Sequence, residues 1–577
     1  MRQPVRAVAR CVALALIAAV LLSAQNEPEW VRKSDENTQV VLRLQAAYDP
    51  EDASVWLRGL DQQVRTISPD TSANYRRDAA RARDELKARF ASEKDPRVRQ
   101  DLAILIELLD RRIATSLLQQ RFFIPYSNVS SIALSGISGL LDNQVAPGRR
   151  EAAVTRLRRY AGLEPGYAPL AVAARQLIEA RLKNNPSLLG PAKAELERDL
   201  SSAEEQIAST PRLFESYKLE GWQPAWTALK QQLTDYQRFL RSAVAPRTRT
   251  SFREPPEIYA DQLINAGVDY SDAEITGIAR AEAIELRSEM QRVAARVAAQ
   301  RKWNAADYRH VLRRLGDEQI ADADILPLYR SRLAAVETLI RANRLITLPS
   351  RPEILRSTRP TDFGSRPQPF LLPPPLVDNR REMGEFVVPT AMTRHADFTS
   401  PAASWALTCE DGRPGRELQY DEIVQRGVSQ ARVFYTSSAI DGWAIYAGWF
   451  MSPFLPDDGR LIELQRRLLR AEAAILASEL QEGAVSPDDA ARTLQNDVVV
   501  SEELARREAH DRLTHAPAGA VAVYARYRRL REIRAAAEKE LAGRFDVQRF
   551  HDFLLGHPLL PARLLREAVL TEFVPEH

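Results

Sequence analysis

The stretch RQDLAILIELLDRRIATSLL, residues 99–118, shows the pattern that decides the fold class. Apolar residues recur in it at spacings of three and four, as at Leu102, Leu105, Leu109 and Ile113. This spacing places the apolar side chains on one face of an α-helix, because each residue turns the helix by about 100°. The stretch therefore predicts an amphipathic helix that packs against a core.

The same period continues on both sides of this stretch. From about residue 37 to residue 243 one helical pattern follows another, and 191–207 repeats the spacing. Turn and helix-start signals separate these patterns at Asp95-Pro96, Pro147-Gly148, Glu164-Pro165-Gly166 and Asn185-Pro186. Only 23 of the 577 residues are glycine, which favours long helices over many short strands. We expect a predominantly helical, all-α fold in which this half is a scaffold.

Composition and charge narrow the classes of partner. Hydrophobic residues make up 45% of the chain and charged residues 27%, as is usual for a globular protein with a large core. Residues 1–24 contain three arginines and no acid, which leaves 77 basic against 77 acidic side chains in the rest. A chain so close to neutral gives no electrostatic reason to expect nucleic acid or an anionic membrane surface as a partner.

The N-terminus has the features of an export signal. Three arginines in the first ten residues precede an apolar run from Cys11 to Leu22, and small residues follow at Ser23 and Ala24. This pattern predicts a signal peptide over residues 1–24 and a periplasmic or secreted protein. The run is shorter than the roughly 20 residues of a spanning helix, so we expect no integral membrane span after its removal.

Two helical regions are expected after the signal, at 25–245 and 256–577. The segment Ala245–Pro256 between them carries three prolines and three arginines without a helical period. In the second region Ser271 and Glu274 have the spacing of a capping box, which predicts a helix running to about Gln300.

A proline-rich strap at 345–390 interrupts this second region, because proline lacks the amide donor that a helix needs. Two β-like runs flank the strap, at 345–348 and 385–389. They predict a small β hairpin or short sheet there. Such a strap either edges a cleft or ties two helical layers together.

Three segments in the last third suggest one site: EDGRPGRELQ at 410–419, DGWAIYAGW at 441–449, and a third that runs from Arg512 to Tyr524. On these residues the chain resembles the bacterial family known as domain of unknown function 885, a zincin-like, all-helical family. Its members carry H-E-x-x-P-G-H-x-x-Q, then E-G-W-A-x-Y, then an arginine followed by P-G-Q-A. The likeness covers roughly residues 255–577. It implies a metallopeptidase-like site in which two histidines and a carboxylate hold zinc and the motif glutamate deprotonates the bound water.

The chain departs from that pattern at each ligand position. Glu410 stands in place of the first histidine, Asp411 in place of the catalytic glutamate, and Arg416 in place of the second histidine. Asp441 replaces the glutamate that opens the second motif. Four polar or aromatic residues of the pattern are retained and are expected to serve binding: Gln419, Trp443, Tyr446 and Arg512. The resemblance therefore implies a degenerate site without metal or cofactor, in a cleft that could take a peptide or other small ligand.

Arg416 carries most of this argument. A guanidinium stays protonated and offers no lone pair, so it cannot ligate a cation and would repel one. We expect Arg416 to pair with Glu410, Asp411 or Asp441, because a buried anion without a partner costs several kcal/mol.

Three functions stay open on the sequence. The first is a catalytically inactive peptidase-like protein that acts as a binding or structural element. The second is a hydrolase or peptidase with a relocated or metal-free site, in which Asp411 and Asp441 would act as acid and base. The third is a structural helical protein with no ligand. We also expect Cys409 to be a buried, inert thiol. Four histidines are expected to be hydrogen-bonded structural residues: His510, His515, His551 and His557.

Overall fold

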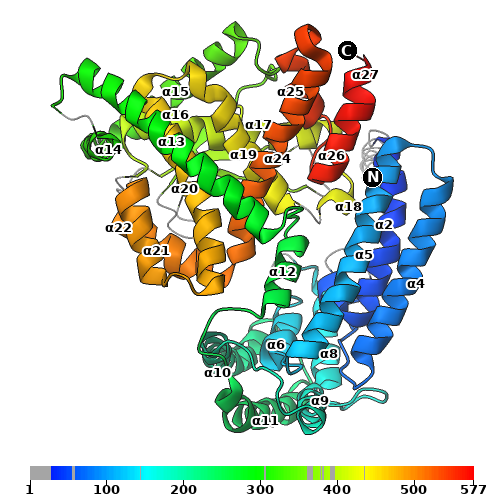
Figure 1. Cartoon of the computed structure of the whole chain (residues 1–577). Helices are drawn as coiled ribbons and strands as arrows, with labels where there is room; N and C mark the ends of the chain where they lie inside the picture. The colour runs from blue at the N-terminus through cyan, green and yellow to red at the C-terminus, as the bar shows by residue number, and fades with distance from the viewer. Residues whose placement is uncertain are drawn as a thin grey trace, which may run out of the picture. The chain divides into compact units, whose positions relative to one another are not determined.

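The computed structural model describes residues 28–54, 59–142, 145–304, 307–359, 368–376, 379, 382–389, 397–433 and 436–576. The predicted signal peptide, 1–24, lies outside these residues. Contacts between residues group the chain into two compact units. Unit 1 contains residues 1–35, 94–101 and 262–577, and unit 2 contains residues 36–93 and 102–261. The chain is mostly helical, which confirms the predicted fold class (Figure 1).

Unit 2 is built from amphipathic helices around one apolar core. The amphipathic stretch 99–118 lies in α5, most of which belongs to this unit. Its core gathers residues such as Ile137, Leu157, Phe214 and Leu233, each under 1% exposed. Its helices, of which α2, α5 and α12 extend into unit 1, are α2 (Glu29–Tyr48), α3 (Pro50–Ala53), α4 (Thr71–Ser92), α5 (Pro96–Phe122), α6 (Val129–Ser138), α7 (Pro147–Arg150), α8 (Ala152–Tyr160), α9 (Leu170–Asn184), α10 (Lys193–Ser216), α11 (Gln223–Phe239) and α12 (Pro256–Asn265).

Unit 1 holds the remaining helices. They are α13 (Asp272–Arg301), α14 (Tyr308–Asp317), α15 (Asp322–Ala342), α16 (Pro401–Asp411), α17 (Arg416–Arg426), α18 (Gln430–Val433), α19 (Thr436–Met451), α20 (Asp457–Glu482), α21 (Pro487–Thr493), α22 (Glu502–Arg506), α23 (Leu513–His515), α24 (Pro517–Leu541), α25 (Val547–Leu555), α26 (Ala562–Ala568) and α27 (Val574–Glu576). Short π-helical turns at Leu240–Val244, Leu494–Val498, Arg507–Arg512 and Val569–Phe573, and 3-10 turns at Ala245–Arg247, Ser452–Phe454 and Ala542–Arg544, join or extend helices of both units.

Two long helices, α13 and α20, form the centre of unit 1 and lie side by side (Figure 1). The start of α13 is the predicted one, because the Ser271 hydroxyl accepts a hydrogen bond from the Glu274 amide at 3.2 Å. Helix α20 also contacts α16 and α24, and α24 contacts α19. Helices α16 and α19, which carry five of the predicted site residues, therefore pack with α20 and α24.

The proline-rich strap contributes a three-stranded sheet with the order β1-β3-β2. Strand β1 (Ile354–Ser357) pairs in parallel with β3 (Glu385–Val388), and β2 (Phe370–Leu372) pairs with β3 antiparallel. The predicted short sheet is thus present, and the run at 385–389 supplies its central strand. The expected strand at 345–348 is wrong, because these residues follow the end of α15 as irregular chain and the partner of β3 begins at Ile354.

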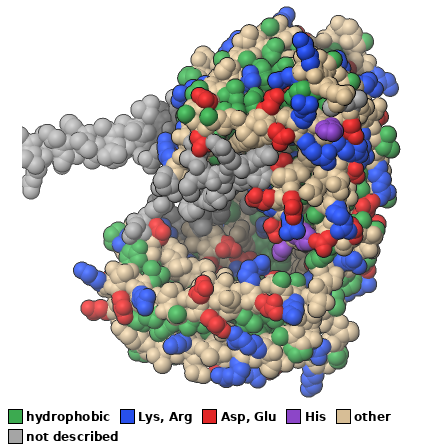
Figure 2. Space-filling model, turned by 90° about the vertical axis from the view of Figure 1, so that its left-hand side faces the viewer, with side chains coloured by type: hydrophobic (Ala, Val, Ile, Leu, Met, Phe, Trp, Pro, Cys, Tyr) green, Lys and Arg blue, Asp and Glu red, His purple; other side chains and the backbone are tan. Residues whose placement is uncertain are grey.

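The surface carries both signs of charge. Figure 2 shows basic and acidic side chains interspersed over the face that it presents. This mixture agrees with the near balance of basic and acidic residues in the sequence. Within the described part of the chain, no helix combines the length and the apolar character that crossing a membrane requires.

Candidate functional site

The first predicted motif forms the junction between α16 and α17. Helix α16 begins at a Ser400 cap and ends at Asp411, and α17 begins at Arg416. The intervening turn brings residue 415 against the end of α16, so closely that a Cβ there would overlap the backbone carbonyl of Glu410. Only glycine allows this approach. Gly415 therefore places Arg416 directly beside the last carboxylate of α16.

Arg416 lies between two carboxylates. Its Nη1 donates to Asp411 Oδ1 at 2.5 Å, and its Nη2 and Nε donate to Asp441 Oδ1 at 2.7 and 3.1 Å. The Asp411 side chain is 8% exposed, that of Arg416 19% and that of Asp441 38%. The guanidinium thus bridges α16 and α19, and it pairs with two of the three carboxylates that the sequence offered as its partners.

Glu410 pairs with a different arginine. Arg466 of α20 donates from Nε to Glu410 Oε1 at 2.8 Å and from Nη2 to Oε2 at 2.5 Å. This is a bidentate pair, the strongest arrangement of guanidinium and carboxylate. The Glu410 side chain is 5% exposed and that of Arg466 13%. Each carboxylate of the motif is therefore already engaged by a guanidinium.

The charges of these groups follow from their surroundings. Burial alone would raise the pKa of Glu410, but Arg466, through its charge and hydrogen bonds, together with the charges of Arg470 and Arg416, outweighs it and lowers that pKa. For Asp411 burial prevails over the opposing effect of Arg416, and its pKa is raised. Burial lowers the pKa of the Arg416 guanidinium, yet Asp411 and Asp441 reverse this and raise it above its usual value.

Two further arginines extend this group: the charge of Arg470 acts on Glu410, and that of Arg512 acts on Arg470. Burial, reinforced by the nearby charge of Arg512, lowers the pKa of Arg470 to about 10. Arg470 Nη1 is buried and makes no hydrogen bond to any described residue. The retained Arg512 is 3.4 Å from Glu508, and its side chain is 34% exposed. Cationic groups therefore gather where a zinc site would need neutral imidazoles.

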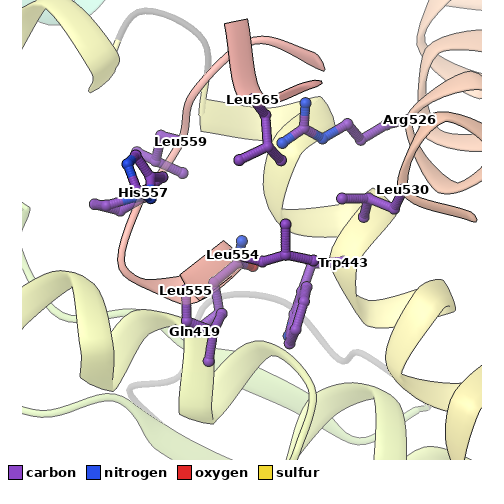
Figure 3. Close-up of a pocket in the computed structure, with 10 residues that line it drawn as sticks. Gln419, Trp443, Arg526, Leu530, Leu554, Leu555, His557, Leu559 and Leu565 are labelled. Carbon is purple, nitrogen blue, oxygen red and sulfur yellow. The ribbon is translucent and has the colours of Figure 1, made fainter. Parts of the chain in front are cut away.

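The retained Gln419 and Trp443 line a small cavity next to this site. Trp443 donates its indole N–H to the carbonyl of Pro414 at 3.0 Å, which ties α19 to the turn before Arg416. Gln419 is one helical turn beyond Arg416 and is 7% exposed. Figure 3 shows both side chains at the cavity, with Arg526 and His557 among the other residues that surround it.

Tyr446, the third retained residue, belongs to an aromatic core and not to the carboxylate cluster. Its hydroxyl lies 3.0 Å from His551 Nε2, and its ring contacts those of Trp443, Trp449 and Phe450. His551 Nδ1 must donate to the Leu345 carbonyl, 2.7 Å away, so its Nε2 accepts from Tyr446. Burial lowers the pKa of His551 to about 3. His551 is a neutral structural residue, as expected.

Cys409 has the properties that were predicted for it. The thiol is free and fully buried, and burial raises its pKa well above the ordinary value. A thiol in this state is a poor nucleophile.

The residues that sequence reasoning missed are arginines on apolar helices. Arg466 and Arg470 stand one turn apart on α20, and Arg526 lies on α24. An arginine at a position where the helical spacing places apolar residues is the signal that could have identified them. Such a guanidinium is buried and therefore requires a partner. Among the described residues, no group of three or more His, Cys, Asp and Glu side chains could hold a metal ion. The donor set of the motif does not fit zinc.

Known proteins share this fold over most of the chain. A protein from Shewanella oneidensis, described as a "putative lipoprotein of unknown function", superposes with a TM-score of 0.71 at 14% identity over 94% of this chain and 100% of its own. A similarly described protein from Colwellia psychrerythraea gives 0.63 at 13% identity over the same shares. No curated protein matches the sequence. The model of a family described as "Bacterial protein of unknown function (DUF885)" matches residues 50–569, so the chain belongs to the DUF885 family.

Proposed function

We propose that this chain is an exported, catalytically inactive relative of metallopeptidase-like proteins, and that it acts as a binding or structural element. One observation carries the proposal: the carboxylates at the motif positions are held by guanidinium groups, Asp411 and Asp441 by Arg416 and Glu410 by Arg466. A divalent cation would have to displace these arginines and would meet their repulsion. Export is supported by the signal-like N-terminus and by the lipoprotein description of the structural neighbours.

The ligand that suits this site is anionic, a peptide carboxylate for example. Arg470 offers a buried N–H that no described residue accepts, and Arg512 lies nearby with a side chain 34% exposed. Guanidinium groups bind carboxylates well because their planar N–H donors match the two oxygens.

Metal analysis tests the inactive site. Purified chain is incubated with zinc, dialysed, and measured by elemental analysis. We expect far less than one zinc per chain, because the motif lacks histidine and its carboxylates are occupied. About one tightly bound zinc per chain would overturn the proposal.

Cleavage of a peptide library distinguishes the alternative of a metal-free peptidase. We expect no turnover above background. Robust cleavage that is lost in Asp411→Asn or Asp441→Asn would establish acid–base catalysis by these carboxylates. If peptides are not cleaved and also do not shift the melting temperature, the purely structural protein is favoured.

A further inference from the structure

Arg526 is a half-buried cation on α24. Among the described residues, no hydrogen bond or ion pair reaches its guanidinium, and its Nε is fully buried. Burial lowers the pKa of Arg526 to about 10, and among the described residues the charge of Asp269 opposes this. The group therefore stays charged at neutral pH inside unit 1.

Two fully buried arginines of the same unit each have a carboxylate partner, unlike Arg526. Arg432 donates to Asp101 at 2.7 Å, and Arg413 donates to Glu417 at 2.8 Å. A buried charge costs several kcal/mol unless a partner compensates it. The structure supplies such a partner for these two arginines but places a cavity beside Arg526.

The cavity lies between α17, α19, α24 and the end of α25. Its walls combine apolar side chains with the polar groups of Gln419, Arg526 and His557. Figure 3 shows Arg526 extending from its helix towards Leu565, with Gln419 and Trp443 below it and His557 opposite. At Gly442 a Cβ would overlap the Arg526 side chain, so this glycine lets α24 bring Arg526 against α19.

Two polar atoms at the cavity also lack hydrogen bonds to the described residues. Gln419 Oε1 and His557 Nε2 are buried, and the ring nitrogen has only Glu572 at 3.4 Å. An amide can turn its NH₂ towards the cavity instead of its oxygen, so Gln419 can donate to a ligand. His557 Nδ1 is engaged with the Phe553 carbonyl at 3.0 Å.

We propose that this cavity binds a small monovalent anion, a halide, between the guanidinium of Arg526 and the amide of Gln419. The proposal is independent of the proposed function. The space of about 10 Å³ holds one particle of the size of a water molecule. Water could satisfy the hydrogen-bonding groups, but it would leave the charge of Arg526 uncompensated. An anion satisfies both, and the leucines around it strengthen the attraction by lowering the local dielectric constant.

Melting temperatures at constant ionic strength test the site on the whole chain. Gluconate, which is too large for the cavity, is replaced stepwise by bromide. We expect the melting temperature to rise by about 2 °C for each tenfold increase in bromide above its dissociation constant. Equal melting in gluconate and in bromide would overturn the proposal.

Two variants separate the cavity from general salt effects. Arg526→Met removes the charge but keeps the length, so it should melt no lower than the natural chain in gluconate and should not respond to bromide. Gln419→Glu supplies a carboxylate inside the cavity and should abolish the response while Arg526 remains. Arg292→Met, an exposed arginine on α13, is the matched control and should keep the full response. A bromide response that persists in both Arg526→Met and Gln419→Glu would refute the site.

Diffraction from a crystal soaked in bromide provides the direct measurement. We expect an anomalous peak between Arg526 and Gln419 in the natural chain. Peaks confined to the protein surface, an adventitious ion only, would contradict the proposal.

Discussion

Asp411 and Arg416 each occupy a position that is unfavourable for their own helix. Asp411 is the last residue of α16 and Arg416 the first of α17, so each charge has the same sign as the helix end that carries it. Their hydrogen bond of 2.5 Å offsets both penalties at once. The pair is therefore expected to be coupled, with neither residue tolerated alone.

Replacing Arg416 with alanine should destabilise unit 1 by about 2–3 kcal/mol, because Asp411 would remain buried without a partner. Added zinc should not restore the loss. Arg296→Ala removes a surface pair with Asp457 and should cost at most about 1 kcal/mol, which makes it the matched control. Calorimetry measures both. Unchanged melting of Arg416→Ala, or its recovery with zinc, would argue against the role assigned to Arg416.

His551 should make stability depend on pH. Its pKa falls from 6.5 to about 3 on folding, so between these values the unfolded chain binds more protons than the folded one. The free energy of unfolding should therefore fall as the pH falls below 6.5, by about 2 kcal/mol between pH 7.5 and pH 5. His551→Gln should flatten this slope, whereas His515→Gln, at an exposed site, should not. Equal slopes in all three proteins would contradict the buried neutral imidazole.

At the scale of elements, buried ion pairs hold the strap to the helices of unit 1. Just before β1, Arg351 pairs with Asp421 of α17, and Glu353 lies 4.0 Å from Arg413. Arg413 also donates to Glu417 at 2.8 Å and to Glu337 of α15 at 2.9 Å. The expectation of a strap that ties helical layers together thus has a physical basis in charged contacts between the chain before β1, α15 and α17.

Glu353 should weaken these contacts at neutral pH. Burial, followed by the nearby Glu417, raises the pKa of Glu353 well above its usual value of 4.5. The folded chain then retains a proton that the unfolded chain releases, so this residue costs stability as the pH rises through 4.5 towards the folded pKa. Each unit by which folding raises the pKa costs about 1.4 kcal/mol once the pH exceeds both values.

The variant Glu353→Gln mimics the protonated carboxyl at every pH. It should raise the melting temperature relative to the natural chain more at pH 8 than at pH 5. The exposed Glu285→Gln on α13 should show no such difference and serves as the control. An equal effect of Glu353→Gln at both pH values would show that the carboxyl is ionised in the folded chain.

On the scale of the whole molecule, every residue of the predicted site lies in unit 1. That unit also includes residues 94–101, far away in sequence, through Asp101, which accepts hydrogen bonds from Arg432 and Ser429 at 2.7 and 2.6 Å. The core of unit 2 contains none of the site residues. The division of the sequence into regions 25–245 and 256–577 stays a prediction from the sequence. The two units described above are defined by contacts between residues.

Local patterns were sufficient for the helices, the cap at Ser271 and the short sheet. These features depend on interactions between residues a few positions apart, which the order of residues displays directly. The sequence also determined that Arg416 would need an anion. Only the tertiary structure decided which one, and it assigned Arg466 to Glu410 and left Arg526 beside a cavity. Which buried charges pair depends on which helices pack together. A single sequence does not show which residues far apart in the chain lie close together in the fold.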